Sequence, residues 1–311
     1  MAEETPYPLL DAGARQAASH YPMRIPSAWS KRIDWHNDRD PLGRQVIPSG
    51  EELRTVAGFV TDPLAEQEAQ QAPGLLQKYR GRVLLQLSGQ CAIHCRFCFR
   101  RHSDYTTLPA DLEGWSPALA WIANDPTLHE VIFSGGDPLM QSDALLAAMT
   151  ERLAAIPHLQ RLRIHSRIPV VNPQRIREPL LHGLTATRLQ PVLVVHCNHP
   201  AELDGPAREA LARLLQAGVL LLNQSVLLRG VNDEVEVLAE LFETLVNLRV
   251  VPYYLHLLDP VAGAAHFEVM EERAKELIRH LQARLPGYAI PRLVREQPGQ
   301  PSKTVVDLCS G

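Results

Sequence analysis

Short apolar runs recur along most of the chain, and longer segments with a helical spacing of apolar residues separate them. Six of the runs are rich in valine, leucine and isoleucine and have the length of buried strands. They cover residues 82–87, 130–134, 161–166, 191–197, 219–228 and 250–258. The segments expected to be helical cover residues 117–123, 143–156, 173–181, 206–217, 234–246 and 267–284. Strands and helices therefore alternate from residue 82 onward.

This alternation is typical of repeated βαβ units, whose right-handed crossovers build a parallel sheet with helices outside. We expect an α/β fold, a partial (β/α)6 barrel of the TIM type, and an open doubly wound sheet is the alternative. Unusual residues follow the strands, as in CAIHCRFC after the first and SGGDPL after the second. Barrel enzymes place their chemistry on the loops at the carboxyl ends of the strands, which favours the barrel.

The first part of the chain differs from the rest. It is polar, with scattered tryptophan, proline and alanine, and shows no strand-like run. Residues 50–60 and 63–71 have the spacing of short helices between turns. We therefore divide the chain into a helical extension at 1–80, a barrel core at 81–285 and a C-terminal segment at 286–311.

Composition narrows the class of protein. Hydrophobic residues make up 45% of the 311 residues, which is enough for a sizeable core and excludes a disordered chain. The net charge of −4 gives no support to general binding of nucleic acid or of a membrane surface. No apolar run reaches the length of a membrane span, and MAEETPYPLL has no signal-peptide pattern. We expect a cytoplasmic protein.

Three of the five cysteines, Cys91, Cys95 and Cys98, form the spacing C-x3-C-x2-C directly after the first predicted strand. An odd number of cysteines argues against a framework of disulfides. Thiolates are ligands of zinc and of iron–sulfur clusters. Zinc would need a further ligand such as His94 or His102, whereas a four-iron cluster on three cysteines keeps one iron open for a small molecule.

CAIHCRFC resembles the hallmark of the radical S-adenosylmethionine (SAM) superfamily, in which three cysteines hold a 4Fe-4S cluster whose open iron binds SAM. The resemblance implies that role for the three cysteines. The segment SGGDPL, one strand later, is similar to the glycine-rich SAM motif of that superfamily, where glycines permit close approach of the backbone. The residues implied there are Ser134, Gly135, Gly136 and Asp137.

Between residues 78 and 303 the chain resembles the lysine 2,3-aminomutase family, which combines radical SAM chemistry with pyridoxal 5'-phosphate (PLP). The matching segments are KYRGRVLLQL, CRFCFRRH, SGGDPL, SRIPVVNPQRI, HCNHPAEL, NQSVLLRGVND, PYYLHLLDPVAGAAHF and QPGQPSK. The resemblance implies an isomerase that moves the amino group of L-lysine from the α- to the β-carbon. The deoxyadenosyl radical would remove a hydrogen from the β-carbon and later return it.

The same resemblance implies the cofactor residues. Lys303, one of only four lysines in the chain, matches the lysine that binds PLP covalently. The residues that match the phosphate site of PLP are Lys78, Tyr79 and Arg82, at the entry to the first strand. The positions that match further SAM-binding residues are His196 and Gln224.

The substrate residues are also implied by the resemblance. Arg100 matches the arginine that binds the α-carboxylate, for which a guanidinium fork is well suited. Asp259 and Glu296 match the acidic partners of the distal ammonium group of lysine. Glu296 stands where metabolic lysine aminomutases carry an aspartate, and it keeps the charge on a side chain one carbon longer.

Two branches of the family compete. The short C-terminus and the segments FRRH, LHLLDPVAGAAHF and PSKT resemble the branch that makes (R)-β-lysine for elongation factor P, to which a separate ligase attaches it. Metabolic lysine 2,3-aminomutases have a longer C-terminal extension with cysteines for zinc. The implied partners are L-lysine, a flavodoxin- or ferredoxin-like reductant and the elongation factor P ligase, with a homo-oligomer possible and no nucleic acid or membrane.

Two alternatives of other kinds remain open from the sequence. One is a zinc-stabilised RNA-binding protein that uses Arg96, Arg100 and Arg101, although the acidic net charge and the absence of an aromatic stacking platform count against it. The other is a radical SAM enzyme without PLP. Cys197 is expected to be a small buried hydrophobe and Cys309 a tail thiol, both without chemistry.

Overall fold

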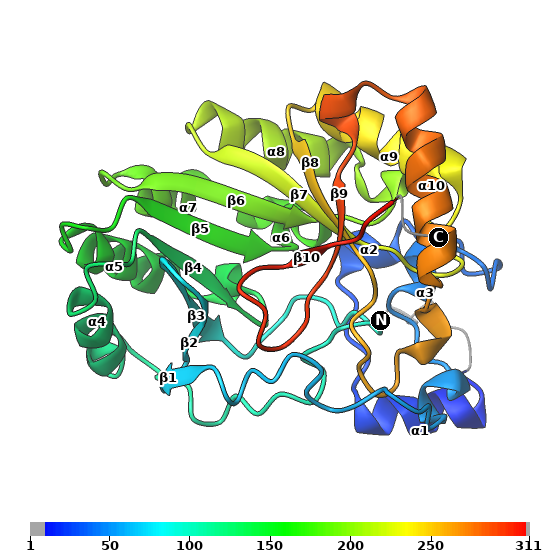
Figure 1. Ribbon diagram of the computed structural model, residues 1–311, viewed down its shortest axis with the longest axis horizontal. Coiled ribbons are helices and arrows are strands. Elements are labelled where there is room, and N and C mark those ends of the chain that lie inside the picture. The colour runs from blue at the N-terminus through cyan, green and yellow to red at the C-terminus, as the bar shows by residue number, and fades with distance from the viewer. Residues whose placement is uncertain (1–9, 309–311) are drawn as a thin grey trace, which may run out of the picture.

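The computed structural model describes residues 10–308, and six neighbouring parallel strands form its centre (Figure 1). Parallel pairing joins each of the six strands to the next in chain order. These strands coincide with the six apolar runs, so that part of the prediction is confirmed. They are β3 (Arg82–Ser88), β4 (Glu130–Gly135), β5 (Arg161–Ser166), β6 (Gln190–His196), β7 (Leu220–Val226) and β8 (Val251–His256).

Four further strands extend this sheet to ten, and the sequence pattern did not predict them. On one side, β1 (Gln70–Ala72) and β2 (Leu75–Tyr79) add antiparallel strands before β3. On the other side, β9 (Arg292–Arg295) continues the parallel part, and β10 (Thr304–Val305) pairs antiparallel with β9. The expectation of a purely helical segment before residue 80 was therefore wrong, and residues 63–71 form turns and the start of β1.

The strand order distinguishes the two predicted architectures. A doubly wound sheet reverses its strand order at a switch point. Here the order runs from β1 to β10 strictly in chain order, as in a βα barrel. The first and last strands of this order are not neighbours, so the sheet is a partial barrel.

Helices cover the outer face of the sheet (Figure 1). Five of the expected helical segments are confirmed within a few residues, whereas residues 173–181 divide into a 3-10 turn and the start of a separate helix, α7. Side-chain caps fix two of the starts, because Ser142 accepts from the Leu145 amide and Asp204 from the Ala207 amide. The outer helices are α4 (Ser116–Ala123), α5 (Asp143–Ala154), α6 (Ile168–Val171), α7 (Glu178–Thr185), α8 (Gly205–Gln216), α9 (Val235–Asn247) and α10 (Glu271–Arg284).

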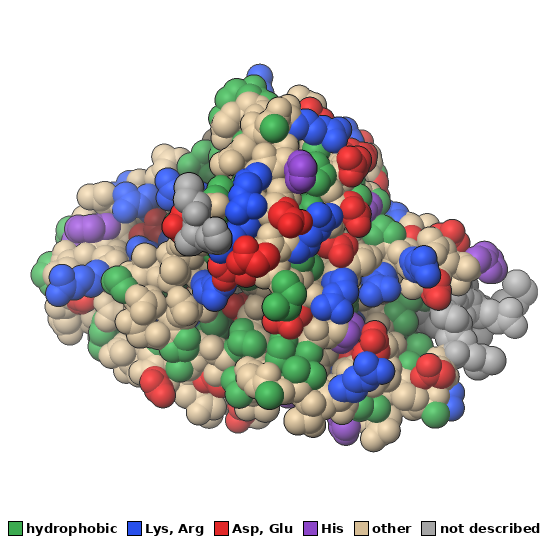
Figure 2. All heavy atoms as spheres, turned by 45° about the vertical axis from the view of Figure 1, so that its right-hand side comes forward, with side chains coloured by type: hydrophobic (Ala, Val, Ile, Leu, Met, Phe, Trp, Pro, Cys, Tyr) green, Lys and Arg blue, Asp and Glu red, His purple; other side chains and the backbone are tan. Residues whose placement is uncertain are grey.

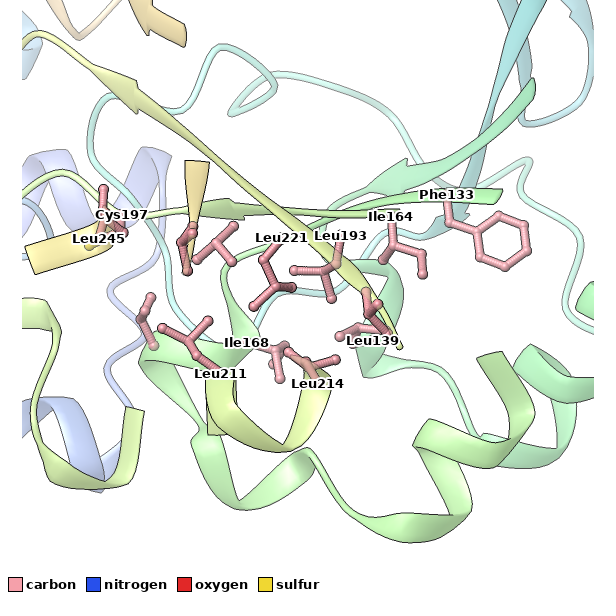
Figure 3. Close-up of a cluster of buried hydrophobic side chains, with 14 of the residues drawn as sticks. Phe133, Leu139, Ile164, Ile168, Leu193, Cys197, Leu211, Leu214, Leu221 and Leu245 are labelled. Carbon is pink, nitrogen blue, oxygen red and sulfur yellow. The ribbon is translucent and has the colours of Figure 1, made fainter. Parts of the chain in front are cut away.

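The main core lies between the sheet and these helices. Figure 3 shows side chains from successive strands pointing toward α8, including Ile164, Leu193 and Leu221, which meet Leu211 and Leu214 of the helix. Along β5 and β7, buried and partly buried positions alternate. The second face of these strands is thus less buried than the apolar composition had suggested, because it faces a cavity.

The segment before the sheet packs onto the same core. It contains α1 (Ala12–His20), α2 (Ser27–Ser30), α3 (Pro41–Arg44) and a 3-10 turn at Gly50–Leu53. Trp29 and Val46 are fully buried in the core that the sheet and its helices form.

The outer surface mixes charges of both signs. Figure 2 shows basic and acidic side chains interspersed over the face that it presents. Within residues 10–308, no helix has the length and apolar character needed to cross a membrane. Cys309 lies outside the described residues.

Candidate active site

A cavity of about 730 Å³ occupies the concave side of the partial barrel. Its wall includes every residue that the sequence analysis assigned to the cluster, SAM, PLP or the substrate. These residues come from the β2–β3 hairpin, from the ends of successive strands and from the loop between β9 and β10. The structure thus brings together positions that lie up to 225 residues apart, from Lys78 to Lys303 (303 − 78 = 225).

The cysteine loop follows β3 and lines the cavity with Cys91, Cys95 and Cys98. All three are free thiols. Burial, and then the proximity of Cys95, raise the pKa of Cys98 to about 11, so the sulfurs lie close enough to repel as thiolates. A metal centre relieves this repulsion by deprotonating and binding the thiols. The donor set of three soft sulfurs therefore fits an iron–sulfur cluster.

A zinc site that uses a neighbouring histidine does not fit the geometry. The Nδ1 group of His94 donates to the Pro22 carbonyl at 2.6 Å, and its ring stacks on Tyr21. The Nε2 group of His102 donates to the Ala262 carbonyl at 3.0 Å. Among the described residues, no three Cys, His, Asp or Glu side chains converge as ligands of one ion. A four-iron cluster binds each cysteine through a different iron, so its ligands stand further apart.

The arginines around the cysteine loop are committed to buried ion pairs. Arg96, which is completely buried, pairs with both carboxylate oxygens of Glu52 at 2.9 and 2.6 Å. Arg101 donates to the same Glu52 carboxylate at 2.6 Å. Arg100 pairs with Glu66 at 2.7 Å. These guanidinium groups are therefore not available to an RNA backbone.

The glycine loop after β4 packs directly against the cysteine loop. A Cβ atom on Gly135, whose φ is +112°, would lie 2.4 Å from the Ser88 carbonyl oxygen. A Cβ atom on Gly136 would lie 2.5 Å from the Gln90 carbonyl oxygen and 3.0 Å from the Cys91 sulfur. Both glycines are required for close approach of the two loops. The sequence analysis had expected the close approach to be to SAM.

Asp137 joins the glycine loop to the end of β5. Its buried carboxylate accepts hydrogen bonds from the Ser166 hydroxyl at 2.8 Å, and from the backbone amides of Leu139 at 3.0 Å and Arg167 at 2.8 Å. Burial raises the pKa of Asp137 to about 6 even though these donors favour the ionised form. The carboxylate thus already has several protein partners, and contact with SAM would fall to the backbone of this loop.

His196 and Gln224 are register partners at the ends of β6 and β7. The His196 ring stacks on Phe97 of the cysteine loop at 5.6 Å, and its Nε2 atom accepts from the Asn198 amide at 3.2 Å. Burial, and then the charge of Arg167, hold the pKa of His196 well below its usual value, so the ring is neutral. Both side chains face the cavity beside the cysteine loop.

The predicted phosphate-binding residues lie on the β2–β3 hairpin. Tyr79 and Arg82 are register partners across a two-residue turn, and Gly81 in that turn has a φ of +75°, which favours glycine. The Arg82 guanidinium lies 4.6 Å from the centre of the Tyr79 ring. Lys78 precedes them and also faces the cavity.

An alternating chain of five charges runs along the cavity wall. Arg100 pairs with Glu66, and Glu66 pairs with Lys78 at 3.1 Å. Lys78 pairs in turn with Glu296 at 2.9 Å, and Glu296 contacts Lys303. Burial alone would raise the pKa of both carboxyl groups, but the adjacent cations lower that of Glu66 to about 2 and hold that of Glu296 well below its usual value. Both carboxylates are therefore ionised.

Arg100 already makes four hydrogen bonds with the protein. Its Nε and Nη2 groups donate to Glu66, and its Nη1 group donates to the Ser134 hydroxyl at 2.9 Å and the Gly135 carbonyl at 3.0 Å. A guanidinium carries five N–H groups. One N–H of Nη2 thus remains for a ligand carboxylate, unless Glu66 moves.

Asp259 lies near the lysine end of the charge chain. Burial, and then the charge of Glu296, raise the pKa of Asp259 to about 7. The two residues expected to bind one ammonium group thus have different states, because Glu296 is paired with lysines and ionised, and Asp259 is half protonated near neutrality.

Several cavity residues were not identified from the sequence. Glu66 had no motif around it, and Arg167 was noted only as part of the segment SRIPVV. His165 and His256 also line the cavity, and their Nε2 atoms have no hydrogen-bond partner among the described residues. Burial, and then the charge of Lys303, lower the pKa of His256 to about 3. The position of the histidines at the ends of β5 and β8 was the one available signal.

Comparison with known proteins places this chain among named relatives. No protein-family model matches it. The L-lysine 2,3-aminomutase of Escherichia coli (strain K12) is 48% identical over 294 residues, which cover 94% of this chain and 86% of the relative. The enzyme of the same name from Haemophilus influenzae is 47% identical over 92% of this chain and 84% of its own. That from Clostridium subterminale is 39% identical over 95% of this chain and 71% of its own.

These identities extend over nearly the whole described chain, and with them the cysteine motif implies a 4Fe-4S cluster and SAM. The zinc-stabilised RNA-binding alternative is thereby set aside, as the buried arginines also require. The chain belongs to the L-lysine 2,3-aminomutase family of radical SAM enzymes.

Proposed function

We propose that this protein is an L-lysine 2,3-aminomutase that forms (R)-β-lysine with a 4Fe-4S cluster, SAM and PLP. The observation that carries the proposal is the single cavity in which three cysteine sulfurs, a glycine loop and Lys303 face one another. Relatives that carry this enzyme name cover more than nine tenths of the chain and support the proposal.

In this proposal, Cys91, Cys95 and Cys98 hold the cluster, and the glycine loop with His196 and Gln224 holds SAM. When bound, the cluster with SAM would supply a carbon-centred radical for hydrogen abstraction, and PLP would supply the conjugated ring that supports migration of the amino group. The protein holds the reactants close together in a space that excludes water.

Lys303 has the role of the lysine that binds PLP covalently. Its ammonium group contacts the Glu296 carboxylate, which favours the protonated form. To act as a nucleophile, the Lys303 amine has to transfer this proton, and Glu296 is the carboxylate in contact with it. Lys78 and Arg82 supply cations for the phosphate group, with Tyr79 between them along the hairpin.

For the substrate, Arg100 supplies the cation for the α-carboxylate, and Asp259 with Glu296 supplies negative charge for the distal ammonium. Glu66 holds the Arg100 guanidinium in a fixed orientation through two hydrogen bonds. Binding of the ammonium group to Asp259 favours the ionised carboxylate and lowers its raised pKa.

The test begins with protein purified without oxygen and assayed for iron, sulfide and PLP. We expect about four irons and one PLP per chain, and formation of β-lysine when reductant, SAM and L-lysine are added. Lys303→Ala should lose PLP and keep the cluster. Lys31→Ala, a change at an exposed lysine, is the matched control and should keep both.

Two results would contradict the proposal at different points. Normal PLP retention in the Lys303→Ala protein would remove the assigned role of Lys303 and favour a radical SAM enzyme without PLP. A parent protein that holds zinc and no PLP after anaerobic reconstitution would overturn the function as a whole.

We further propose that the β-lysine serves modification of elongation factor P. The segments FRRH, LHLLDPVAGAAHF and PSKT support this branch over metabolic production of β-lysine. The test supplies the enzymatic product to purified elongation factor P and its ligase, and measures the mass of the factor. Attachment of product at the rate of authentic (R)-β-lysine is expected, and a product that the ligase rejects would favour the metabolic alternative.

A further inference from the structure

We propose that Arg167 is a positioning residue for the iron–sulfur cluster, which donates a charged hydrogen bond to the Cys95 sulfur and makes the cluster easier to reduce. The inference rests on the cluster of the proposed function. It concerns a residue that no motif identified, and a property, the reduction potential, that the proposed function leaves open.

The contact is direct and buried. The Nη1 group of Arg167 lies 2.8 Å from the Sγ atom of Cys95. Arg167 is only 6% exposed, and a guanidinium remains charged at all accessible pH values. A hydrogen bond from a charged donor in a site with little water is stronger than one between neutral groups.

The guanidinium is held in place without help from the cysteine. Its Nη2 group donates to the Gln45 side chain at 2.5 Å and to the Glu202 carboxylate at 3.1 Å. Gln45 also donates to Glu202, at 3.1 Å, so the two acceptors fix each other. The Trp29 ring lies 4.7 Å from the guanidinium carbon. Arg167 is therefore oriented toward the sulfur before any metal binds.

The backbone of Arg167 is fixed as well. Its amide donates to the Asp137 carboxylate at 2.8 Å, which ties this residue to the glycine loop beside the cysteine motif. Gln45 and Trp29 come from the segment that precedes the sheet. This segment thus supports the cysteine loop through Arg167, which gives it a function at the site.

The expected effect on the cluster follows from its charge. A cluster that accepts an electron becomes more negative, and its cysteine sulfurs share that charge. Hydrogen bonds and positive charge at the sulfurs stabilise the reduced state more than the oxidised state, which raises the reduction potential. The Glu202 charge lies on the far group of the guanidinium, Nη2, whereas Nη1 faces the sulfur. The cation is thus the nearer charge.

The experiment uses the full chain with its reconstituted cluster and measures the midpoint potential by titration monitored with electron paramagnetic resonance. Arg167→Gln alone would leave Glu202 buried without its partner, so the double variant Arg167→Gln/Glu202→Gln removes both charges. We expect it to keep its iron and to show a more negative midpoint potential than the parent protein. Arg167→Lys should shift in the same direction by a smaller amount.

Glu202→Gln is the matched control, because it keeps Arg167 and removes the opposing charge, and we expect an unchanged or more positive potential. If a fully iron-loaded double variant, or a fully loaded Arg167→Lys protein should the double variant not fold, keeps the parent potential, Arg167 has a structural role alone and the inference fails. A parent protein without any cluster signal would instead refute the proposed function.

Discussion

At the scale of the residue, Glu66 is the most heavily engaged side chain of the cavity wall. Its carboxylate binds Arg100 through two hydrogen bonds and Lys78 at 3.1 Å, and it is 9% exposed. The two cations that it neutralises are those proposed to bind the substrate carboxylate and the cofactor phosphate. Glu66 thus occupies, in the absence of these anions, the place of a counter-ion.

Replacing Glu66 by alanine should destabilise the protein strongly. The change leaves two cations in the cavity wall without their carboxylate, and loss of one partner of a buried ion pair costs about 3–5 kcal/mol. The free energy of unfolding from urea titration measures the loss. Glu68→Ala, at an exposed neighbour, should stay within about 0.5 kcal/mol of the parent. Equal stability of the two variants would show that the Glu66 contacts contribute nothing.

Asp259 should make the stability depend on pH. Its pKa is about 7 in the folded chain against an ordinary value of 3.8, so the folded state binds more protons than the unfolded state between these values. The unfolding free energy from this group therefore falls as the pH rises through that window. Asp259→Asn removes the dependence, so the stability of the variant relative to the parent should increase from about pH 5 to about pH 8. A difference that is constant with pH would contradict the raised pKa.

The residue scale also shows the limit of prediction from the sequence. Cys91, Gly136 and Lys303 stand in recognisable motifs, and each faces the cavity. Glu66 stands in no motif, because its role depends only on two cations brought beside it by the fold. Pairing of this kind leaves no periodic pattern in the sequence.

At the scale of the element, the predicted strands are those with a continuous apolar run. The strand β2, Leu75–Tyr79, has two apolar residues followed by Gln77 and Lys78, because its second half faces the polar end of the cavity. The strand β9 has two apolar residues between arginines. Both strands depend on pairing with a longer neighbour, and this is not visible in their own sequence.

The contact of the glycine loop with the cysteine loop predicts an effect on the cluster. Gly136→Ala places a Cβ atom 2.5 Å from the Gln90 carbonyl oxygen, so one loop has to shift. We expect less iron per chain after reconstitution than in the parent protein. Gly205→Ala, whose Cβ atom would meet nothing within 4 Å, should bind iron normally. Full iron loading of the Gly136→Ala protein would show that the loops tolerate separation.

At the scale of the whole molecule, the segment before the sheet is part of the folding unit. Trp29 is fully buried, and the guanidinium groups of Arg32 and Arg167 lie 4.8 and 4.7 Å from its ring. Arg32 also donates to the carbonyls of Glu202 and Val170, on the helical side of the sheet. The segment thus links elements that are distant in sequence.

Trp29→Ala should therefore affect the molecule as a whole. Removal of a buried tryptophan costs about 3–5 kcal/mol, and we expect this loss in a single unfolding transition. Tyr288→Ala is the control, because that side chain is 71% exposed. Thermal unfolding followed by circular dichroism measures both. A separate early transition in the Trp29→Ala protein, with the sheet intact, would show that the segment folds independently.

The order of the cavity wall along the chain sets an order of assembly during biosynthesis. The cysteine and glycine loops are synthesised before residue 140, whereas Glu296 and Lys303 follow all other residues of the wall. The strand β9, which carries these two residues into place, can pair only with a finished β8. Under the proposed function, the emerging chain presents its cluster ligands to the iron-delivery machinery first. Attachment of PLP is then the last step of maturation, made by the segment that completes the wall.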